Sequence, residues 1–210
     1  ETRIITYNEL GYISNEILLE EEFSGNDMTI TQNNFLVTGS TSEMNYRLIN
    51  PSGDLIWETS HTITNNVYSV SQLSNGDFIS IGGGSSTALE NYLVKFNNSG
   101  EILWSKNHRG IKVLAINNNE FLAATNDENL DEMNLVRFNS EGGIVWSKPL
   151  INFDTSTALN IINYDMNYFI CSYLAQNNKL NILVLDQNGN EINLHTIDNG
   201  FVSYKSITKT

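Results

Sequence analysis

The side chains with the most chemical potential lie together in one short acidic segment, TNDENLDEMN, at residues 125–134. Carboxylate oxygens at this density could bind Ca²⁺. Carboxylates such as Asp127 or Asp131 could also serve a glycan-active hydrolase or lyase. Because an acidic segment is more often a solvated loop, we predict no metal site and keep Asp127, Glu128 and Asp131 only as the calcium candidates.

Three other segments resemble sites, and each has a simpler structural explanation. DQNGNE, at residues 186–191, begins like a calcium-binding loop but lacks the glutamate at its twelfth position, so we predict a turn. GGGSST, at residues 82–87, is not followed by the lysine of a phosphate-binding loop. Cys171 is the only cysteine and stands in the apolar run YFICSYL, where we expect a buried core residue.

Composition limits the class of protein and of partner. The chain has 210 residues, 40% of them hydrophobic and 10% aromatic, which is typical of a folded globular protein. The formal net charge of −13 argues against nucleic acid and against anionic membrane surfaces, because both attract Lys and Arg. We find no apolar run long enough to insert into a membrane and no signal-peptide pattern in the chain as given.

The elements that must position these residues are repeated along the chain. An apolar or aromatic residue, then Asn or Asp, two free positions and Gly occurs at residues 7–11, 49–53, 96–100, 138–142 and 185–189. The glycines are therefore 42 or 47 residues apart. Gly53, Gly100 and Gly142 are each followed four residues later by a tryptophan, namely Trp57, Trp104 and Trp146. Asn15 and Asn193 hold the tryptophan position in the first and last copies.

Each copy predicts β-structure. Asn or Asp before two polar residues and Gly is turn chemistry, because Gly readily supplies the positive φ that a tight hairpin needs. Alternating apolar residues flank the turns, as Tyr92, Val94 and Phe96 do before Gly100. A second hairpin precedes each of four turns, and its later strand carries an aromatic residue: Phe35, Phe78, Phe121 and Phe169. The repeated unit is therefore four short antiparallel strands, and we find no helical period.

A repeated four-stranded unit of this length predicts an all-β fold, a β-propeller of antiparallel blades in a single domain, residues 1–210. Residues 1–23 supply a partial blade, and full blades span 24–62, 63–109, 110–151 and 152–198. Residues 199–210 provide the first strand of a further or closing blade. Either this strand joins the N-terminal pair in a composite blade that closes a five-bladed ring, which we favour, or the chain is a piece of a longer propeller.

This pattern resembles the tryptophan-docking repeat of quinoprotein-like propellers. It is also similar to the repeats of secreted and surface-anchored bacterial propeller proteins, lipoproteins among them. The resemblance implies that the three tryptophans dock between neighbouring blades, and it implies an extracellular or bacterial cell-surface location. The acidic, aromatic and paired-cysteine residues with which quinone dehydrogenases of this group hold calcium and cofactor cannot be mapped here, so we predict no cofactor.

The three histidines are expected to be structural. His61 and His108 stand four residues after a repeat tryptophan, and His195 stands at a similar place in the last unit. Equivalent positions in different blades are too far apart to share one metal ion. We therefore expect exposed side chains at the ends of outer strands.

Propeller topology also predicts a binding face. The loops between second and third strands share one face and vary in length, whereas the turns on the other face repeat closely. Binding sites are usually built on variable loops held by a rigid scaffold. We therefore predict a binding face that includes Gly83, Ser85, Asn126, Asp127, Glu128 and Asp131.

The predicted function is a non-catalytic binding or scaffolding module in a secreted or cell-surface complex. The partner would be a protein, with a glycan as the other candidate, and we nominate no catalytic residue. Two alternatives stay open. One is the glycan-active hydrolase or lyase, and the other is an accessory subunit with no ligand of its own.

Overall fold

The computed structural model describes residues 2–19, 23–40, 43–61, 66–83, 92–126, 132–153, 159–164, 168–175 and 179–198. All regular structure in these ranges is β, and they contain 18 strands. These ranges hold no helix with the length and apolar character of a membrane-crossing segment. The strands gather into two compact units, which are described separately.

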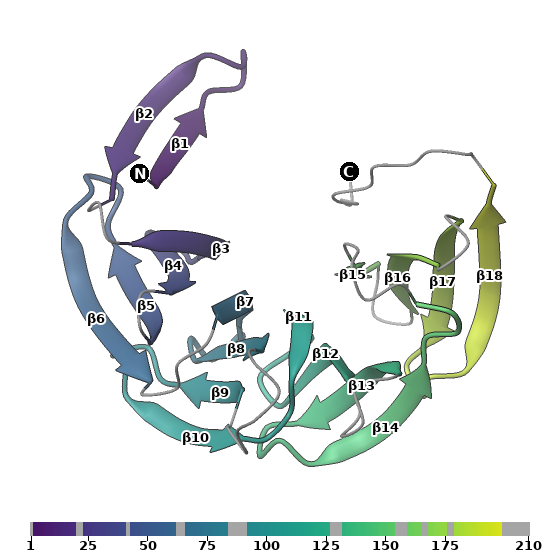
Figure 1. The fold of residues 1–210 in the computed structure, drawn as a ribbon. Coiled ribbons are helices and arrows are strands. Elements are labelled where there is room, and N and C mark those ends of the chain that lie inside the picture. The colour runs from purple at the N-terminus through teal and green to yellow at the C-terminus, as the bar shows by residue number, and fades with distance from the viewer. Residues whose placement is uncertain are drawn as a thin grey trace. The chain divides into compact units, whose positions relative to one another are not determined.

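The first unit contains three antiparallel sheets with their strands in chain order (Figure 1). A two-stranded sheet is formed by β1 (Arg3–Tyr7) and β2 (Ile13–Leu18). A four-stranded sheet follows, made of β3 (Ser24–Ile30), β4 (Phe35–Ser40), β5 (Met44–Ile49) and β6 (Leu55–His61). The next contains β7 (Asn66–Gln72), β8 (Phe78–Gly83), β9 (Leu93–Phe96) and β10 (Ile102–Lys106).

The second unit contains two four-stranded sheets of the same kind (Figure 1). The first is made of β11 (Gly110–Ala115), β12 (Glu120–Asn126), β13 (Met133–Asn139) and β14 (Ile144–Pro149). The second is made of β15 (Leu159–Asn163), β16 (Tyr168–Leu174), β17 (Leu180–Asp186) and β18 (Glu191–Ile197). The predicted all-β arrangement of four-stranded antiparallel sheets is confirmed. The strand predicted within residues 199–210 lies outside the described residues.

The Asn/Asp-x-x-Gly segments form tight turns between the third and fourth strands, and we call them glycine turns. They comprise residues 8–11, 50–53, 97–100, 139–142 and 186–189, and each of their glycines has a positive φ, which is 87° at Gly100. The side chain of Asn97 explains the first position of the motif, because its Oδ1 accepts the backbone N–H groups of Ser99 and Glu101 at 3.0 and 2.9 Å. The turn is thus specified locally by its own residues.

A β-bulge follows each glycine turn at the start of the outer strand. In β10 the register passes from Ile102 opposite Phe96 to Trp104 opposite Lys95, which leaves one extra residue in the outer strand. The same shift places Trp146 opposite Arg137. Because residues directly opposite each other share a face of the sheet, the bulge fixes the face to which each tryptophan points.

Aromatic pairs form the core at the turn end of two sheets. Phe78 lies opposite Phe96 with their ring centroids 5.3 Å apart, and Phe121 lies opposite Phe138 at 5.1 Å. All four side chains are buried. Packing of this kind explains why the second strands of these two sheets carry an aromatic residue near their start.

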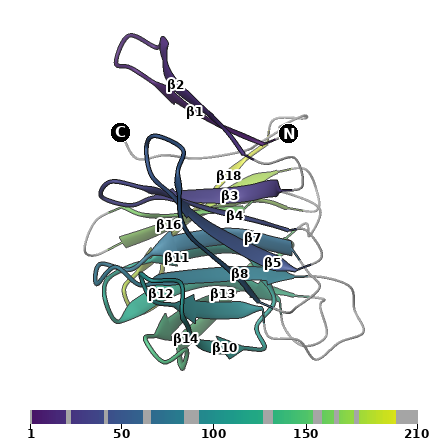
Figure 2. The same cartoon turned by 90° about the vertical axis from the view of Figure 1, so that its left-hand side faces the viewer.

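Inner strands pack side by side within each unit. β3 lies beside β7 in the first unit (Figures 1 and 2), and β11 lies beside β15 in the second. The Asp27 carboxylate accepts the backbone N–H of Val70 at 3.0 Å, which ties β3 to β7. The hydroxyl of buried Tyr46 lies 2.8 Å from that of Ser80, so the two polar groups satisfy each other between neighbouring sheets.

Candidate functional site

The predicted binding face begins at the ends of β8 and β12, and the structure describes only some of its residues. Gly83 ends β8 and is buried, and a Cβ placed on it would lie 3.3 Å from the Tyr68 ring. Asn126 ends β12, and its backbone N–H donates to the Arg109 carbonyl at 3.0 Å. Ser85, Asp127, Glu128 and Asp131 lie outside the described residues, so the calcium and hydrolase hypotheses stay predictions.

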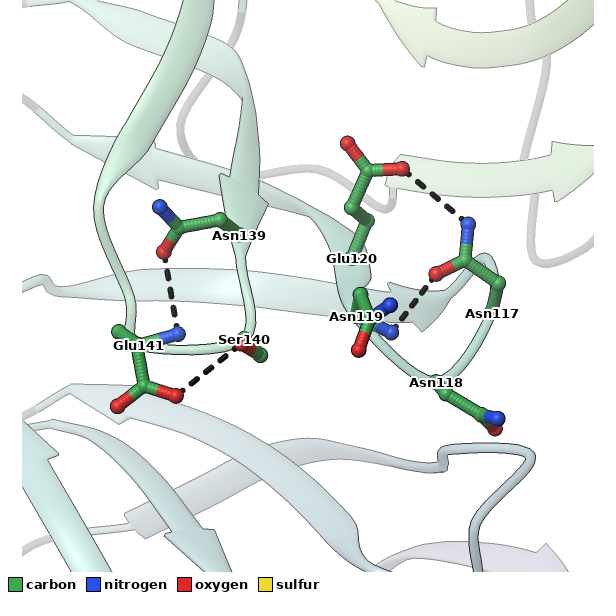
Figure 3. A pocket seen from close by; sticks show the side chains of 7 residues that line it. All are labelled: Asn117, Asn118, Asn119, Glu120, Asn139, Ser140 and Glu141. Carbon is green, nitrogen blue, oxygen red and sulfur yellow. Dashed lines mark hydrogen bonds between the residues drawn. The ribbon is translucent and has the colours of Figure 1, made fainter.

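The structure contains a hollow of about 470 Å³ at the other end of the β11–β14 sheet. β12 and β13 pair from Asn126 opposite Met133 at one end to Glu120 opposite Asn139 at the other, so the hollow and the predicted face lie at opposite ends. Figure 3 shows the β11–β12 turn and the glycine turn of β13–β14 facing each other across it. Its lining residues are Asn117, Asn118, Asn119, Glu120, Asn139, Ser140 and Glu141.

Hydrogen bonds within the two turns hold the walls of the hollow in place. Asn139 Oδ1 accepts the backbone N–H groups of Glu141 and Gly143 at 3.1 and 2.8 Å. Asn117 Oδ1 accepts the backbone N–H of Asn119 at 2.8 Å (Figure 3). Each wall is therefore a rigid turn, and the exposed amides of Asn118 and Asn119 are presented on one of them.

Glu120 is one of the two carboxylates that line the hollow, with Glu141, and the charge of Glu120 is balanced. Its Oε2 accepts a hydrogen bond from Arg137 Nη2 at 2.7 Å and another from Asn117 Nδ2 at 3.2 Å. The hydrogen bond from Arg137 is the main reason why the pKa of Glu120 is lowered. Arg137 also donates through Nη1 to the Gln187 carbonyl, which ties β13 to the next glycine turn.

This electrostatic arrangement suits binding better than acid catalysis. A carboxyl group that acts as a general acid near neutral pH needs a raised pKa, and the pKa of Glu120 is shifted the other way. Within the described ranges, no group of three or more His, Cys, Asp and Glu side chains could hold a metal ion. The hollow therefore offers amide donors and acceptors beside two carboxylates, of which Glu120 is ionised and paired with Arg137.

The prediction of exposed histidines was right for His195 and wrong for the other two. His195 is exposed and lies 2.8 Å from Asn193 Nδ2. His108 is half-buried because its ring packs edge-on against Phe138, with centroids 5.1 Å apart. His61 is half-buried at the end of β6, and burial lowers its pKa. These contacts make the three histidines parts of separate local packing arrangements.

Two further residues that the sequence singled out are structural. Cys171 is fully buried in β16, and burial raises the pKa of its thiol, so it stays a neutral core residue. Asp186 begins the last glycine turn, where its Oδ1 accepts the backbone N–H groups of Asn188 and Asn190 at 2.8 and 2.9 Å. Hydrogen bonding, chiefly from the Asn190 side chain, lowers the pKa of Asp186. DQNGNE is thus a self-bonded turn.

Two tryptophans lie on the glycine turn of the following sheet. Trp57 Nε1 donates to the Asn98 carbonyl at 3.0 Å, and a Cβ on Gly100 would lie only 2.9 Å from Trp57 Cε3. Trp146 Nε1 donates to the Gln187 carbonyl at 3.1 Å, and a Cβ on Gly189 would lie 2.7 Å from Trp146 Cδ2. Glycine is therefore required twice over, by its positive φ and by the ring that covers it.

Solved structures identify the fold, although no family model and no curated protein sequence matches the chain. A protein of unknown function from Bacteroides caccae matches with a TM-score of 0.65 and 13% identity, over 92% of this chain and 68% of that one. The Pan2 WD40 domain of Neurospora crassa matches with a TM-score of 0.61 and 13% identity, over 87% of this chain and 55% of that one. WD40 repeats build four-stranded propeller blades. The chain has a β-propeller fold.

A further propeller gives the same result. BamB from Moraxella catarrhalis matches with a TM-score of 0.60 and 11% identity, over 92% of this chain and 55% of that one. This chain thus spans just over half the length of BamB and of the Pan2 domain. At these identities the likeness concerns the fold alone, and each four-stranded sheet of the chain is a propeller blade.

Sequence reasoning missed two features of these blades. The first is the hollow, whose only signal was the run of three asparagines at residues 117–119. The second is the role of Asn15, which stands at a tryptophan position. Its Nδ2 donates to the Pro51 carbonyl at 2.8 Å, as the indoles do on later turns. Ile17 covers that turn, since a Cβ on Gly53 would lie 3.1 Å from Ile17 Cγ2.

Proposed function

We propose that this propeller is a non-catalytic scaffold that binds a protein partner through the hollow of the β11–β14 blade. The observation that carries the proposal is the pair of rigid polar turns that face each other across this hollow. A preformed surface loses little conformational entropy on binding, so modest polar contacts can hold a partner there.

The chemistry of the lining favours a partner rich in hydrogen-bonding groups. Asn118 and Asn119 supply both amide donors and carbonyl acceptors at the exposed edge. Glu120 is already paired with Arg137, so a partner need not bring a cation to neutralise it. An extended peptide segment presents alternating N–H and C=O groups of the kind that these amides complement.

The wider setting is also a proposal. Tryptophans that dock on glycine turns support the assignment of quinoprotein-like repeats, which resemble those of secreted and surface-anchored bacterial proteins. We infer that the scaffold works in an extracellular or cell-surface complex. The loop face that includes Gly83, Ser85 and Asn126–Asp131 is the second surface available to such a complex.

The test is purification of the tagged full chain from its native source, followed by affinity measurement with the partner that co-purifies. Asn118→Arg combined with Asn119→Arg places two bulky cations at the edge of the hollow. Gln32→Arg combined with Asn33→Arg is the matched control, because these exposed residues occupy the same turn of the β3–β6 blade. We expect the first pair to weaken binding at least tenfold and the control pair to leave it unchanged.

Three results would contradict the proposal. Equal binding by both double variants would remove the hollow as the binding surface. Binding of a glycan instead of a protein by the same hollow would reassign the partner class. Turnover of a polysaccharide that disappears in Asp127→Ala or Asp131→Ala would replace the scaffold with the hydrolase or lyase hypothesis.

A further inference from the structure

The glycine turns of this chain act as receptors for a side chain from the preceding sheet. Three of them are occupied in the described structure. Trp57 covers the turn of Gly100, Trp146 covers the turn of Gly189, and Asn15 with Ile17 covers the turn of Gly53. In each case a side-chain N–H donates to the carbonyl of the second turn residue, and apolar atoms lie over the glycine.

The first glycine turn, residues 8–11, has the same receptor geometry. Gly11 has a φ of 82°, and its N–H donates to the Asn8 carbonyl at 2.9 Å, as the N–H of Gly100 does to Asn97 at 3.1 Å. Asn8 Oδ1 accepts the backbone N–H groups of Leu10 and Tyr12, each at 3.0 Å. The carbonyl of Glu9 therefore occupies the position that Asn98 and Gln187 have in the covered turns.

This turn is open, in contrast to the three covered turns. Apart from its two chain neighbours, no described residue of the first unit has an atom within 4 Å of a Cβ built on Gly11. The loop that joins β1 and β2 stands clear of the other strands of its own unit in both views (Figures 1 and 2). Within the described part of the first unit, the receptor half of a docking contact is thus present without a ligand half.

The residues around Gly11 are apolar, in contrast to those of the other copies. Leu10 replaces Ser52, Ser99, Glu141 and Asn188 of the later turns. Tyr12 replaces Asp54, Glu101, Gly143 and Asn190. Leu10 and Tyr12 are 81% and 69% exposed, which leaves two large apolar side chains beside an uncovered glycine. Such a group of exposed apolar residues marks an interaction surface.

We propose that the Gly11 turn is a docking site for a tryptophan-bearing strand of a partner polypeptide. The indole lies over Gly11, its Nε1–H donates to the Glu9 carbonyl, and the neighbouring residues of the strand pack on Leu10 and Tyr12. The covered turns of the same chain define this ligand, because indoles cover two of them. The proposal concerns a different surface from the hollow and stands or falls independently of it.

The chain supplies its own probe for this site. A peptide of residues 101–107, EILWSKN, carries the indole in the sequence of a natural outer strand. It is titrated into the isotope-labelled full chain, and amide shifts are followed by NMR. A single docked side chain predicts weak binding, with Kd on the order of 0.1–1 mM. We expect the shifts to concentrate at residues 8–13, and a peptide with alanine at its tryptophan position should produce none there.

Matched glycine variants test the docking geometry in chains that still fold. Asn tolerates a positive φ, so Gly11→Asn keeps the turn while its side chain occupies the place of the indole. Gly76→Asn is the control, since Gly76 has a φ of 92° in a turn that no tryptophan covers among the described residues. We expect Gly11→Asn to weaken binding at least tenfold and Gly76→Asn to leave it unchanged, with both unfolding like the wild type.

A third variant separates indole docking from general apolar contact. Leu10→Ser with Tyr12→Glu gives the positions on either side of Gly11 the residues that flank Gly100, whose turn folds with them in the same chain. Weakened but detectable binding is the expected result. The proposal is overturned if no shifts occur near Gly11 at millimolar peptide, if they map to another surface, or if Gly11→Asn binds as well as the wild type.

Discussion

A single indole shows how one residue can join two blades. Trp57 donates its indole N–H to the Asn98 carbonyl and covers Gly100. Its ring also meets the rings of Phe78 and Phe96 edge-on, with centroids 6.3 and 6.1 Å away. Edge-on contact between rings is favourable because the positive edge of one ring meets the negative face of the other. The tryptophan thus combines packing with a directed hydrogen bond.

Because Trp57 contributes both packing and a hydrogen bond, two substitutions can separate the two contributions to stability. We expect Trp57→Ala to lower the free energy of unfolding by about 3 kcal/mol, since it removes the packed ring. Trp57→Phe keeps most of the ring contacts and loses the hydrogen bond, which costs about 1 kcal/mol. Urea unfolding followed by circular dichroism measures both values. Equal losses in the two variants would mean that the hydrogen bond, rather than packing, dominates.

At the scale of strands and turns, a cation on the third strand pairs with an acid at the start of the second strand in two of the blades. Arg137 bridges the start of β12 to the glycine turn of the next blade through Glu120 and Gln187. Lys95 holds the equivalent position in β9, and its Nζ lies 3.4 Å from Asp77, which directly precedes β8. A cation paired with an acid beside the aromatic residue of the second strand therefore occurs in the β7–β10 and β11–β14 blades.

The Glu120–Arg137 pair predicts a pH dependence of stability. The pKa of Glu120 is lowered in the folded chain, mainly by the hydrogen bond from Arg137. Its stabilising contribution is therefore complete above the ordinary carboxyl pKa of about 4.3 and is lost as pH falls through the lowered folded value. We expect Glu120→Gln to reduce stability at pH 7 and to make the fall in stability below pH 4.5 less steep. Urea midpoints between pH 7 and 3 measure this, and parallel curves would contradict it.

At the scale of the whole molecule, charge is the dominant long-range property. The chain carries 24 acidic and 11 basic residues, with a net charge of −13 and an isoelectric point near 4.5. Mutual repulsion among these charges opposes the compact state at low ionic strength. The same charge repels phosphate-rich partners.

Salt should therefore stabilise this protein at neutral pH. Raising ionic strength from 0.01 to 0.15 M shortens the screening length from about 30 to about 8 Å. We expect Tm to rise by about 2–4 °C, the shift that roughly 1 kcal/mol produces in a chain of this size. Differential scanning calorimetry at pH 7 measures the rise, and it should disappear at pH 4.5, where the net charge is near zero. An equal rise at both pH values would show that repulsion is not its cause.

The sequence by itself determined the β-architecture, because its signals are local. Asn97 bonds within its own turn and Gly100 supplies the positive φ there, so the motif marks each hairpin wherever it occurs. The aromatic residues of the second strands, such as Phe78 and Phe121, follow from the same period. The fold class could be predicted for this reason without knowing any contact between distant residues.

Only the tertiary structure decided which turns come together and which are covered. The hollow joins residues 117–120 to residues 139–141 through the register of β12 and β13, which no local pattern encodes. Asn15 breaks the repeat in the sequence, yet its side chain makes the same hydrogen bond as the indoles. The sequence does not reveal this bond, because its acceptor, the Pro51 carbonyl, lies 36 residues away. The open turn at Gly11 is likewise visible only by comparison with its covered equivalents. Strand pairing joins residues that are far apart in the sequence. It therefore determines where the candidate surfaces lie, more than the local turn motif does.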